Sequence, residues 1–425
     1  MNGKLLILPA AVLLLVLGAF LWWLLAVAPR MAEVPEPTAL AAEPEPAAPA
    51  ASPAASPAPT PEPAPEAAPS PSPEPTPEPT PEPTAAELLL GEMSLEEKLW
   101  QLLVVRPGDL VGLYPVTSLD GSEIAVLRSF PAGGYFLDAG NMRDSEQLKA
   151  LTAALTADAA ITPLVLCDEE GGTVARLMNT VGTTRIGSMY SYREQGRETA
   201  FQNARTIGGD LREHGLNTDL APVADVWSNP ANTVIHTRAY SDDFAQAAEL
   251  VAAAVEGFHA GGVACTLKHF PGHGDTAEDS HNGAAFVHKT LEQLREEELL
   301  PFRAGIEAGA DMVMIGHLTV PALDERPAPF SPAIVQGLLR GELGFSGVAI
   351  TDALEMGALQ DYGEGEAALL ALEAGVDLLL CPDDPAMLVN YLAAAVAEGK
   401  LSEERVDESV LRVLSVKEAR GLLHG

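Results

Sequence analysis

The segment GGVACTLKHFPGHGDTAEDSH, residues 261–281, contains the end of a helix, a buried strand and a polar loop. Two glycines precede the uncharged run 263–267, as expected where a helix ends and a strand begins. The run ends in Lys268 and His269, and the loop that follows holds two further histidines. This order predicts one unit of a parallel α/β protein, with polar chemistry at the carboxyl end of the strand.

The same unit recurs along the chain. Short apolar runs alternate with stretches in which apolar residues lie three and four positions apart, the pattern of amphipathic helices. We expect parallel strands at residues 102–105, 133–137, 164–169, 220–226, 263–270, 311–318, 347–353 and 377–383. Eight such units favour an α/β fold of the closed (β/α)₈, TIM-like barrel type. A doubly wound open sheet is the alternative, but no glycine-rich phosphate-binding turn follows the first run.

The first 84 residues have a different composition. Residues 5–28 carry no charge, and about 36 Å of helix would cross a membrane, so we expect residues 1–30 to form a transmembrane anchor, with a cleaved signal segment as the alternative. Residues 31–84 contain 19 prolines and no Lys or Arg, which predicts a disordered linker. We therefore expect residues 85–425 to form the folded domain, outside the cytoplasm at the cell surface, or secreted if the segment is cleaved.

Charge and cysteine content restrict the class of protein further. Residues 85–425 hold 51 acidic and 23 basic side chains, which argues against nucleic acid as a partner. Cys167, Cys265 and Cys381 lie in apolar runs without a CxxC pattern. We expect buried thiols there, since an odd count without such a pattern gives neither a disulfide framework nor a zinc framework.

The polar loop at residues 268–281 allows three interpretations. A surface turn is the first, although so many charged residues at a strand end are rarely without function. Zinc binding is the second, but Pro271 and the neighbouring glycines prevent the helical spacing that suits zinc best. Its ligands would be His269, His273, Asp275, Asp279 and His281. Acid–base chemistry on a glycosidic bond is the third.

The sequence resembles glycoside hydrolase family 3, in particular its bacterial β-N-acetylglucosaminidase branch. The resemblance covers about residues 88–420 and is carried by DEEGGTVARL (168–177), LAPVADVWSNPANTVIHTRAY (220–240), KHFPGHGDTAEDSH (268–281) and AITDALEM (349–356). It implies a barrel enzyme without metal or other cofactor. The implied activity is that of a retaining exo-β-N-acetylhexosaminidase, which releases terminal N-acetylglucosamine from a carbohydrate substrate such as a cell-wall (peptidoglycan) glycan or muropeptide.

The resemblance also implies roles for individual residues. Asp352 would be the nucleophile that forms a covalent glycosyl-enzyme, although an aspartate there could also serve only as a helix N-cap. His281 would be the general acid and base, and Asp279 would orient its imidazole. His273 would brace the Pro-Gly turn. The substrate-binding residues would be Asp168, Arg176, Arg238, Lys268 and His269, with Arg176 also neutralising Asp168.

Three positions depart from the pattern of the branch. Trp227 stands where asparagine is common, His236 replaces a glycine, and Ala285 replaces a proline. These changes leave Asp352 and His281 in place but affect the side of the site that receives the aglycone. The sequence leaves open phosphorolysis in place of hydrolysis, a metal-dependent hydrolase, and a catalytically silent barrel that binds the cell wall.

Overall fold

The computed structural model describes residues 83–276, 283, 285–356 and 362–423. The predicted membrane segment and almost all of the predicted linker lie outside these residues. Contacts divide the chain into two units, residues 1–78 and 79–425, and only the second contains described residues. Within the described ranges, no helix is both long enough and apolar enough to cross a membrane.

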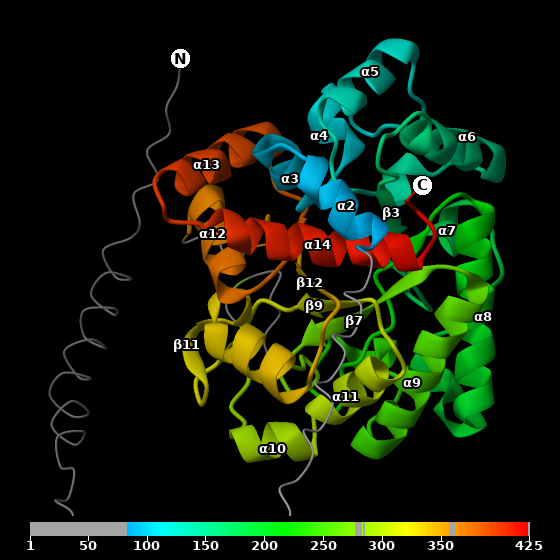
Figure 1. The fold of residues 1–425 in the computed structure, drawn as a ribbon. Helices are drawn as coiled ribbons and strands as arrows, with labels where there is room; N and C mark the ends of the chain where they lie inside the picture. The colour runs from blue at the N-terminus through cyan, green and yellow to red at the C-terminus, as the bar shows by residue number, and fades with distance from the viewer. Residues whose placement is uncertain (1–82, 277–282, 284, 357–361, 424–425) are drawn as a thin grey trace, which may run out of the picture. The chain divides into compact units, whose positions relative to one another are not determined.

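Among the described residues, eight parallel strands form one sheet around the centre of the domain (Figure 1). Their order in the sheet is β12-β9-β7-β6-β3-β2-β1-β13. A parallel bridge between Ile350 and Leu378 brings the two edges together, so the predicted TIM-like barrel is confirmed as a nearly closed one. The strands are β1 (Leu103–Val105), β2 (Gly134–Phe136), β3 (Leu164–Cys167), β6 (Thr218–Asp219), β7 (Ala264–Phe270), β9 (Met312–Ile315), β12 (Val348–Thr351) and β13 (Leu379–Leu380).

Helices surround this sheet and follow its strands (Figure 1). The α-helices are α2 (Ala85–Glu92), α3 (Leu95–Gln101), α4 (Pro107–Val111), α5 (Gly121–Ser129), α6 (Ser145–Thr156), α7 (Arg176–Thr180), α8 (Gly196–Glu213), α9 (Phe244–Gly261), α10 (Leu291–Glu296), α11 (Leu299–Glu307), α12 (Glu364–Ala374), α13 (Pro385–Ala397) and α14 (Glu403–Ala419). Helix α9 explains the double glycine that precedes β7. Asp243 caps its start by accepting the Gln246 N–H, and Gly262 ends it in the left-handed conformation at φ 89°.

Shorter elements connect the barrel units. They are the antiparallel pair β4 (Glu169–Gly171) and β5 (Val174–Ala175), the small sheet of β8 (Ala285–Phe286), β10 (Leu318–Val320) and β11 (Asp324–Pro327), the 3₁₀ helices η2 (Ala139–Asn141), η3 (Met189–Gln195), η4 (His236–Arg238) and η5 (Ala328–Phe330), and the π-helix η6 (Ala333–Glu342). Strands β4 and β5 together with η4 lie on the carboxyl side of the barrel strands that they follow, so they can contribute side chains to that end.

Helix α14 closes the opposite end of the barrel. Its Val413 and Val416 belong to the same hydrophobic cluster as Leu164 and Val348, the first residues of β3 and β12. Helix α2 packs on α14, and the backbone N–H of Ala85 donates to Glu418 Oε1 at 3.1 Å. The described chain therefore begins at the amino-terminal end of the barrel, and the carboxyl ends of the strands lie at the other end.

The prediction of a strand at residues 220–226 is wrong. The strand of this unit is β6, Thr218–Asp219. Beyond it the pairing with β7 continues irregularly, through a bridge between Val223 and Lys268 and backbone hydrogen bonds such as that from the Thr266 N–H to Ala221 O at 2.8 Å. Pro222 lacks the N–H that a central strand needs, which explains the early end of the ladder. The helical segment after β8 is divided into α10 and α11, because the backbone leaves the helical region at Glu297.

The cysteines and the surface agree with the composition. All three cysteines are free and buried, as predicted.

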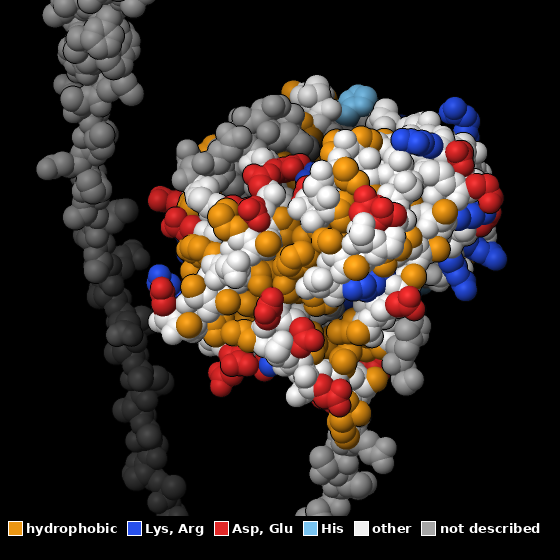
Figure 2. Space-filling view, turned by 90° about the horizontal axis from the view of Figure 1, so that it is seen from above, with side chains coloured by type: hydrophobic (Ala, Val, Ile, Leu, Met, Phe, Trp, Pro, Cys, Tyr) orange, Lys and Arg blue, Asp and Glu red, His pale blue; other side chains and the backbone are white. Residues whose placement is uncertain are grey.

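Figure 2 shows one face of the molecule, on which apolar side chains occupy the middle and acidic side chains are spread among and around them. An acidic exterior of this kind fits the strong net negative charge of −35 for the whole chain.

Candidate active site

A cavity of about 610 Å³ lies at the carboxyl ends of the barrel strands. It is lined by every predicted nucleophile or substrate-binding residue that the structure describes, namely Asp168, Arg176, Arg238, Lys268, His269 and Asp352. A smaller cavity of about 320 Å³ near α3 and α5 contains none of them. The structure thus brings together residues from four segments that are up to 184 positions apart in the sequence.

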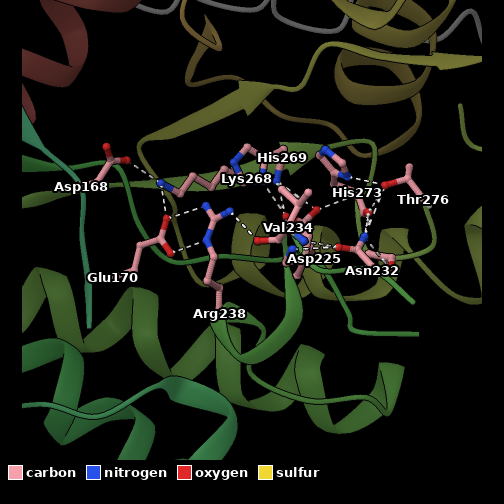
Figure 3. Close-up of polar contacts among 12 residues, drawn as sticks. Asp168, Glu170, Asp225, Asn232, Val234, Arg238, Lys268, His269, His273 and Thr276 are labelled. Carbon is pink, nitrogen blue, oxygen red and sulfur yellow. Dashed lines mark hydrogen bonds and ion pairs between the residues drawn. The ribbon is translucent and has the colours of Figure 1, made fainter. Parts of the chain in front are cut away.

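A buried carboxylate, Glu170, holds two of the cavity's cations (Figure 3). Its Oε1 lies 2.6 Å from Lys268 Nζ and 2.8 Å from Arg238 Nη2, while its Oε2 accepts from Arg238 Nε at 2.8 Å. Burial acts to raise the pKa of Glu170, but the adjacent charges of Arg238 and Lys268 outweigh it and the pKa is lowered. Glu170 therefore stays ionised and fixes both cations at the cavity wall.

Asp168 is the second carboxylate of this ionic cluster (Figure 3). Its Oδ1 accepts from Lys268 Nζ at 2.7 Å, and its Oδ2 accepts from Arg176 Nη2 at 3.1 Å. The predicted pairing of Arg176 with Asp168 is therefore confirmed. Burial favours a lower pKa for Lys268, but the charges of Asp168 and Glu170 prevail and raise it, so this ammonium remains protonated. A sugar in the cavity would meet fixed donors and a carboxylate in a defined arrangement.

Asp225 orients His269 from behind (Figure 3). This aspartate is 1% exposed, and its Oδ2 accepts from His269 Nδ1 at 2.6 Å. It also accepts the backbone N–H groups of His269 at 3.1 Å and of His273 at 2.7 Å. Although burial favours the neutral carboxyl, the positive potential of His269 lowers the pKa of Asp225. Because the Nδ1 proton points to Asp225, the Nε2 atom of His269 is the one available at the cavity.

His273 has a different environment from His269. It is 2% exposed and does not line the cavity. Its Nδ1 lies 2.7 Å from Thr276 Oγ1, and burial lowers its pKa. The neutral ring thus holds the first turn of the loop that follows β7, which agrees with the expected bracing role.

Asp352 follows β12 directly. Its backbone N–H donates to Ile315 O at 3.2 Å, and its Oδ1 accepts the N–H of Ala353 at 2.8 Å. Burial would raise the pKa of Asp352, but the potentials of His269 and His317 lower it further than burial raises it. The carboxylate is therefore ionised at neutral pH, which is the state that a nucleophile needs.

The predicted general acid and base, His281, and its partner Asp279 lie outside the described residues. Their roles stay predictions. The described parts of the chain before and after them are held by a buried residue, Glu298. Its side chain lies against Gly272, and its Oε1 accepts from Lys289 Nζ at 2.8 Å.

Sequence reasoning missed Glu170 as part of the site, although a signal was present. In an extended strand, side chains two positions apart point to the same side, and Glu170 follows Asp168 by two. It also missed the pair of Arg106 and Glu355 on the cavity wall, whose shorter contact is 2.6 Å. These two residues follow different strands, and no local pattern links them.

The metal interpretation receives no support from the histidines beside the cavity. Among the residues that the structure describes, neither His269 nor His273 belongs to a cluster of potential metal ligands. Among the described residues, the potential metal ligands that cluster are His259, Cys265 and Asp311, at the opposite ends of β7 and β9. The guanidinium of Arg420 lies 2.6 Å from His259 Nε2, so a cation already occupies this position.

The barrel fold and the polar cavity at the carboxyl ends of its strands are those of a barrel enzyme. Comparison of the chain with known proteins identifies its family. Residues 94–416 match the model of the glycosyl hydrolase family 3 N terminal domain, so the chain belongs to glycosyl hydrolase family 3. The predicted family resemblance is confirmed.

Relatives and solved structures show the same family. The chain is 36% identical over 333 residues to the beta-hexosaminidase A of Pseudoalteromonas piscicida, covering 71% of this chain and 56% of that protein. It is 38% identical over 270 residues to a beta-hexosaminidase of Stenotrophomonas maltophilia, covering 62% and 80%. A solved family 3 beta-N-acetylglucosaminidase from Paenibacillus sp. str. FPU-7 superposes with a TM-score of 0.73 at 38% identity, covering 78% of this chain and 64% of that one.

Proposed function

We propose that this protein is a retaining exo-β-N-acetylglucosaminidase. The observation that carries the proposal is the placement of an ionised Asp352 in the same cavity as the clustered sugar-binding candidates Asp168, Lys268 and Arg238. The relatives named beta-hexosaminidase and the solved beta-N-acetylglucosaminidase support the same activity. A charged carboxylate beside hydroxyl-binding groups suits attack on an anomeric carbon.

The first chemical step is glycosylation of the enzyme. The Asp352 carboxylate attacks the anomeric carbon and forms the Asp352–sugar ester, while the bond to the aglycone oxygen breaks. His281 gives its proton to that oxygen, with Asp279 stabilising the imidazolium before transfer. In the second step His281 takes a proton from water, the water oxygen bonds to the anomeric carbon, and Asp352 leaves as a carboxylate.

The polar groups of the cavity account for substrate binding in this mechanism. The free lone pairs of Asp168 accept hydroxyl protons, and Lys268, Arg176 and His269 add donors or acceptors in fixed positions. Because Glu170 holds Lys268, Asp168 holds Arg176 and Asp225 holds His269 before substrate arrives, little conformational entropy is lost on binding.

The proposed setting is the cell surface. The charge-free segment at residues 5–28 and the proline-rich linker support a membrane-anchored, extracytoplasmic domain. Cell-wall fragments or muropeptides that end in N-acetylglucosamine are the proposed substrates. Phosphorolysis is the second candidate reaction, since a neutral imidazole in place of a second carboxylate would allow a phosphate anion to approach.

The test is hydrolysis of an aryl β-N-acetylglucosaminide by the full chain and by the Asp352→Asn and His281→Ala variants. We expect loss of turnover in Asp352→Asn, no effect of EDTA, and a free sugar as the product whether or not phosphate is present. Activity retained by Asp352→Asn would refute the mechanism. Sensitivity to EDTA would favour a metal hydrolase, a sugar phosphate would favour the phosphorylase, and carbohydrate binding by an inactive wild type would favour the silent barrel.

A further inference from the structure

Three aromatic side chains form a stack on the surface beside the cavity. The rings of Trp227 and His236 have centroids 4.3 Å apart, and the ring of Tyr190 meets Trp227 edge-on at 5.0 Å. Tyr190 is held in place, because its hydroxyl donates to Asp242 at 2.8 Å and Arg193 lies 4.0 Å above its ring. His236 is exposed and the other two rings are half-buried. We call Tyr190, Trp227 and His236 the aromatic stack.

The stack carries local energetic costs that its packing does not explain. His236 adopts φ 43°, in the left-handed region that a side chain other than glycine occupies only at a cost of about 1–2 kcal/mol. The indole N–H of Trp227 is buried without a hydrogen-bond partner among the described residues. Backbone strain and unpaired buried polar groups are concentrated at functional sites in proteins. Here the strain is at His236 and the unpaired N–H is at Trp227, whose rings are in contact.

The position of the stack follows from its chain neighbours. His236 begins η4, and Val234 and Arg238, two residues to either side, both line the cavity. On the other side of the stack, Asn229 Nδ2 donates to Asp275 O at 3.1 Å, which joins the Trp227 segment to the loop after β7. The stack therefore borders the cavity where η4 meets that loop.

We propose that the aromatic stack is a binding subsite for a second sugar ring, on the aglycone side of the scissile bond. The inference rests on the proposed glycosidase function and adds the residues that would bind the second sugar ring of a β-linked oligosaccharide substrate. The face of a pyranose that carries axial C–H groups is apolar, and it stacks on a half-buried aromatic ring with little loss of hydration. In this subsite Trp227 provides most of the aromatic surface, His236 extends that surface toward solvent, and Tyr190 packs edge-on against Trp227 and holds it in place.

The experiment uses His236→Gly in the full chain. Glycine adopts φ 43° without strain, so this variant removes the exposed ring while leaving the backbone free to keep its path. We compare kcat/KM for a β-1,4-linked N-acetylglucosamine tetrasaccharide with kcat/KM for an aryl β-N-acetylglucosaminide. The ratio of tetrasaccharide to aryl values is expected to fall about three- to tenfold, with a melting temperature equal to or above that of the wild type.

A matched control is Tyr391→Ala, which removes an exposed aromatic ring on α13. Its ratio is expected to equal that of the wild type. An unchanged ratio in His236→Gly, or an equal fall in the control, would overturn the subsite. A lower melting temperature with an unchanged ratio would show that the ring is only structural and would also overturn it.

Failure of the underlying function is measured separately. A wild-type protein that hydrolyses neither substrate refutes the glycosidase, and the subsite is then tested by calorimetric titration of the tetrasaccharide into wild type and His236→Gly. Weaker binding by the variant supports the subsite in a non-catalytic barrel, and equal binding refutes it.

Discussion

Replacing Glu170 by glutamine removes one charge from the centre of the ionic cluster while keeping the size of the side chain. The glutamate makes three contacts with Lys268 and Arg238, and all three use its oxygens as acceptors. An amide retains one oxygen, which preserves at most two of these contacts. The amide N–H₂ must then face either Arg238 or Lys268, so a donor meets a donor at a site that is 4% exposed.

The expected cost follows from this geometry. A hydrogen bond to a charged group contributes about 1.5–3 kcal/mol, and removing one member of a buried ion pair costs about 3–5 kcal/mol. We therefore expect Glu170→Gln to lower the free energy of unfolding by about 3–5 kcal/mol. For a domain of about 340 residues the entropy of unfolding is about 0.7 kcal/mol/K, so this corresponds to a fall in melting temperature of roughly 4–7 °C.

The assay is urea and thermal unfolding of both proteins, followed over pH. The folded pKa of Glu170 is lowered, so its stabilising contribution is fully present above its unfolded pKa of about 4.3 and is lost as pH falls below that value. The stability curves of wild type and Glu170→Gln should therefore converge at acidic pH. Because Lys268 and Arg238 also lose their fixed positions, kcat/KM should fall by more than about tenfold.

The matched control is Glu355→Gln. Glu355 also pairs with an arginine through both carboxylate oxygens, with contacts to Arg106 of 2.6 and 2.9 Å, but its side chain is 41% exposed. An exposed pair contributes about 0–1 kcal/mol, so this variant should unfold close to wild type. If Glu170→Gln unfolds within about 2 °C of wild type, or no more easily than Glu355→Gln, the reasoning from burial and charge is refuted.

Three further results are expected. Because its pKa is lowered, Asp352 stays ionised above about pH 4, so a fall in kcat/KM that is assigned to this residue must lie below that pH, which a pH–rate profile checks. Burial lowers the pKa of Lys417 to about 7, so wild-type stability rises with pH between about 7 and 10; Lys417→Met should gain about 2 kcal/mol or more in urea unfolding at pH 7.5, and a gain that persists at pH 10 would contradict this cause. The three cysteines are buried, and burial raises the pKa of each thiol, so a thiol reagent should label the native protein far more slowly than the unfolded protein; fast native labelling would place a thiol at the surface.

Much of the barrel could be predicted because its strands are buried on both sides. Seven of the eight apolar runs coincide with barrel strands. Strands of a parallel sheet are covered on both faces, so a short continuous apolar run between two helical patterns is typical of them. The prediction of a strand at residues 220–226 failed because the apolar residues there are buried in a segment without regular strand structure. The sequence shows burial at this point, but Pro222 lacks the N–H that a regular ladder needs, so the pairing with β7 continues only irregularly.

The residues of the candidate site also differ in how far the sequence could predict them. Polar residues at strand ends, such as Asp168 and Lys268, stand out because a strand end on this fold faces the cavity. Glu170 and Asp225 are harder to assign, since their roles depend on which buried partners the fold brings within 3 Å. The aromatic stack required contacts between positions 190, 227 and 236, and no periodicity connects them.

The filled interior of the barrel, which α14 closes at one end, has a consequence for how a substrate can enter and leave the cavity. Leu220, Met314 and Leu380 line the cavity from the barrel interior, and the interior is filled by apolar side chains as far as Val413 and Val416, so a polymer cannot be threaded through the barrel. Under the proposed exo activity, the glycan presents its terminus to this cavity, and the released sugar must leave by the way it came in. Each turnover on a long chain therefore requires the remaining chain to back out before the freed monosaccharide can escape, which works against processive degradation.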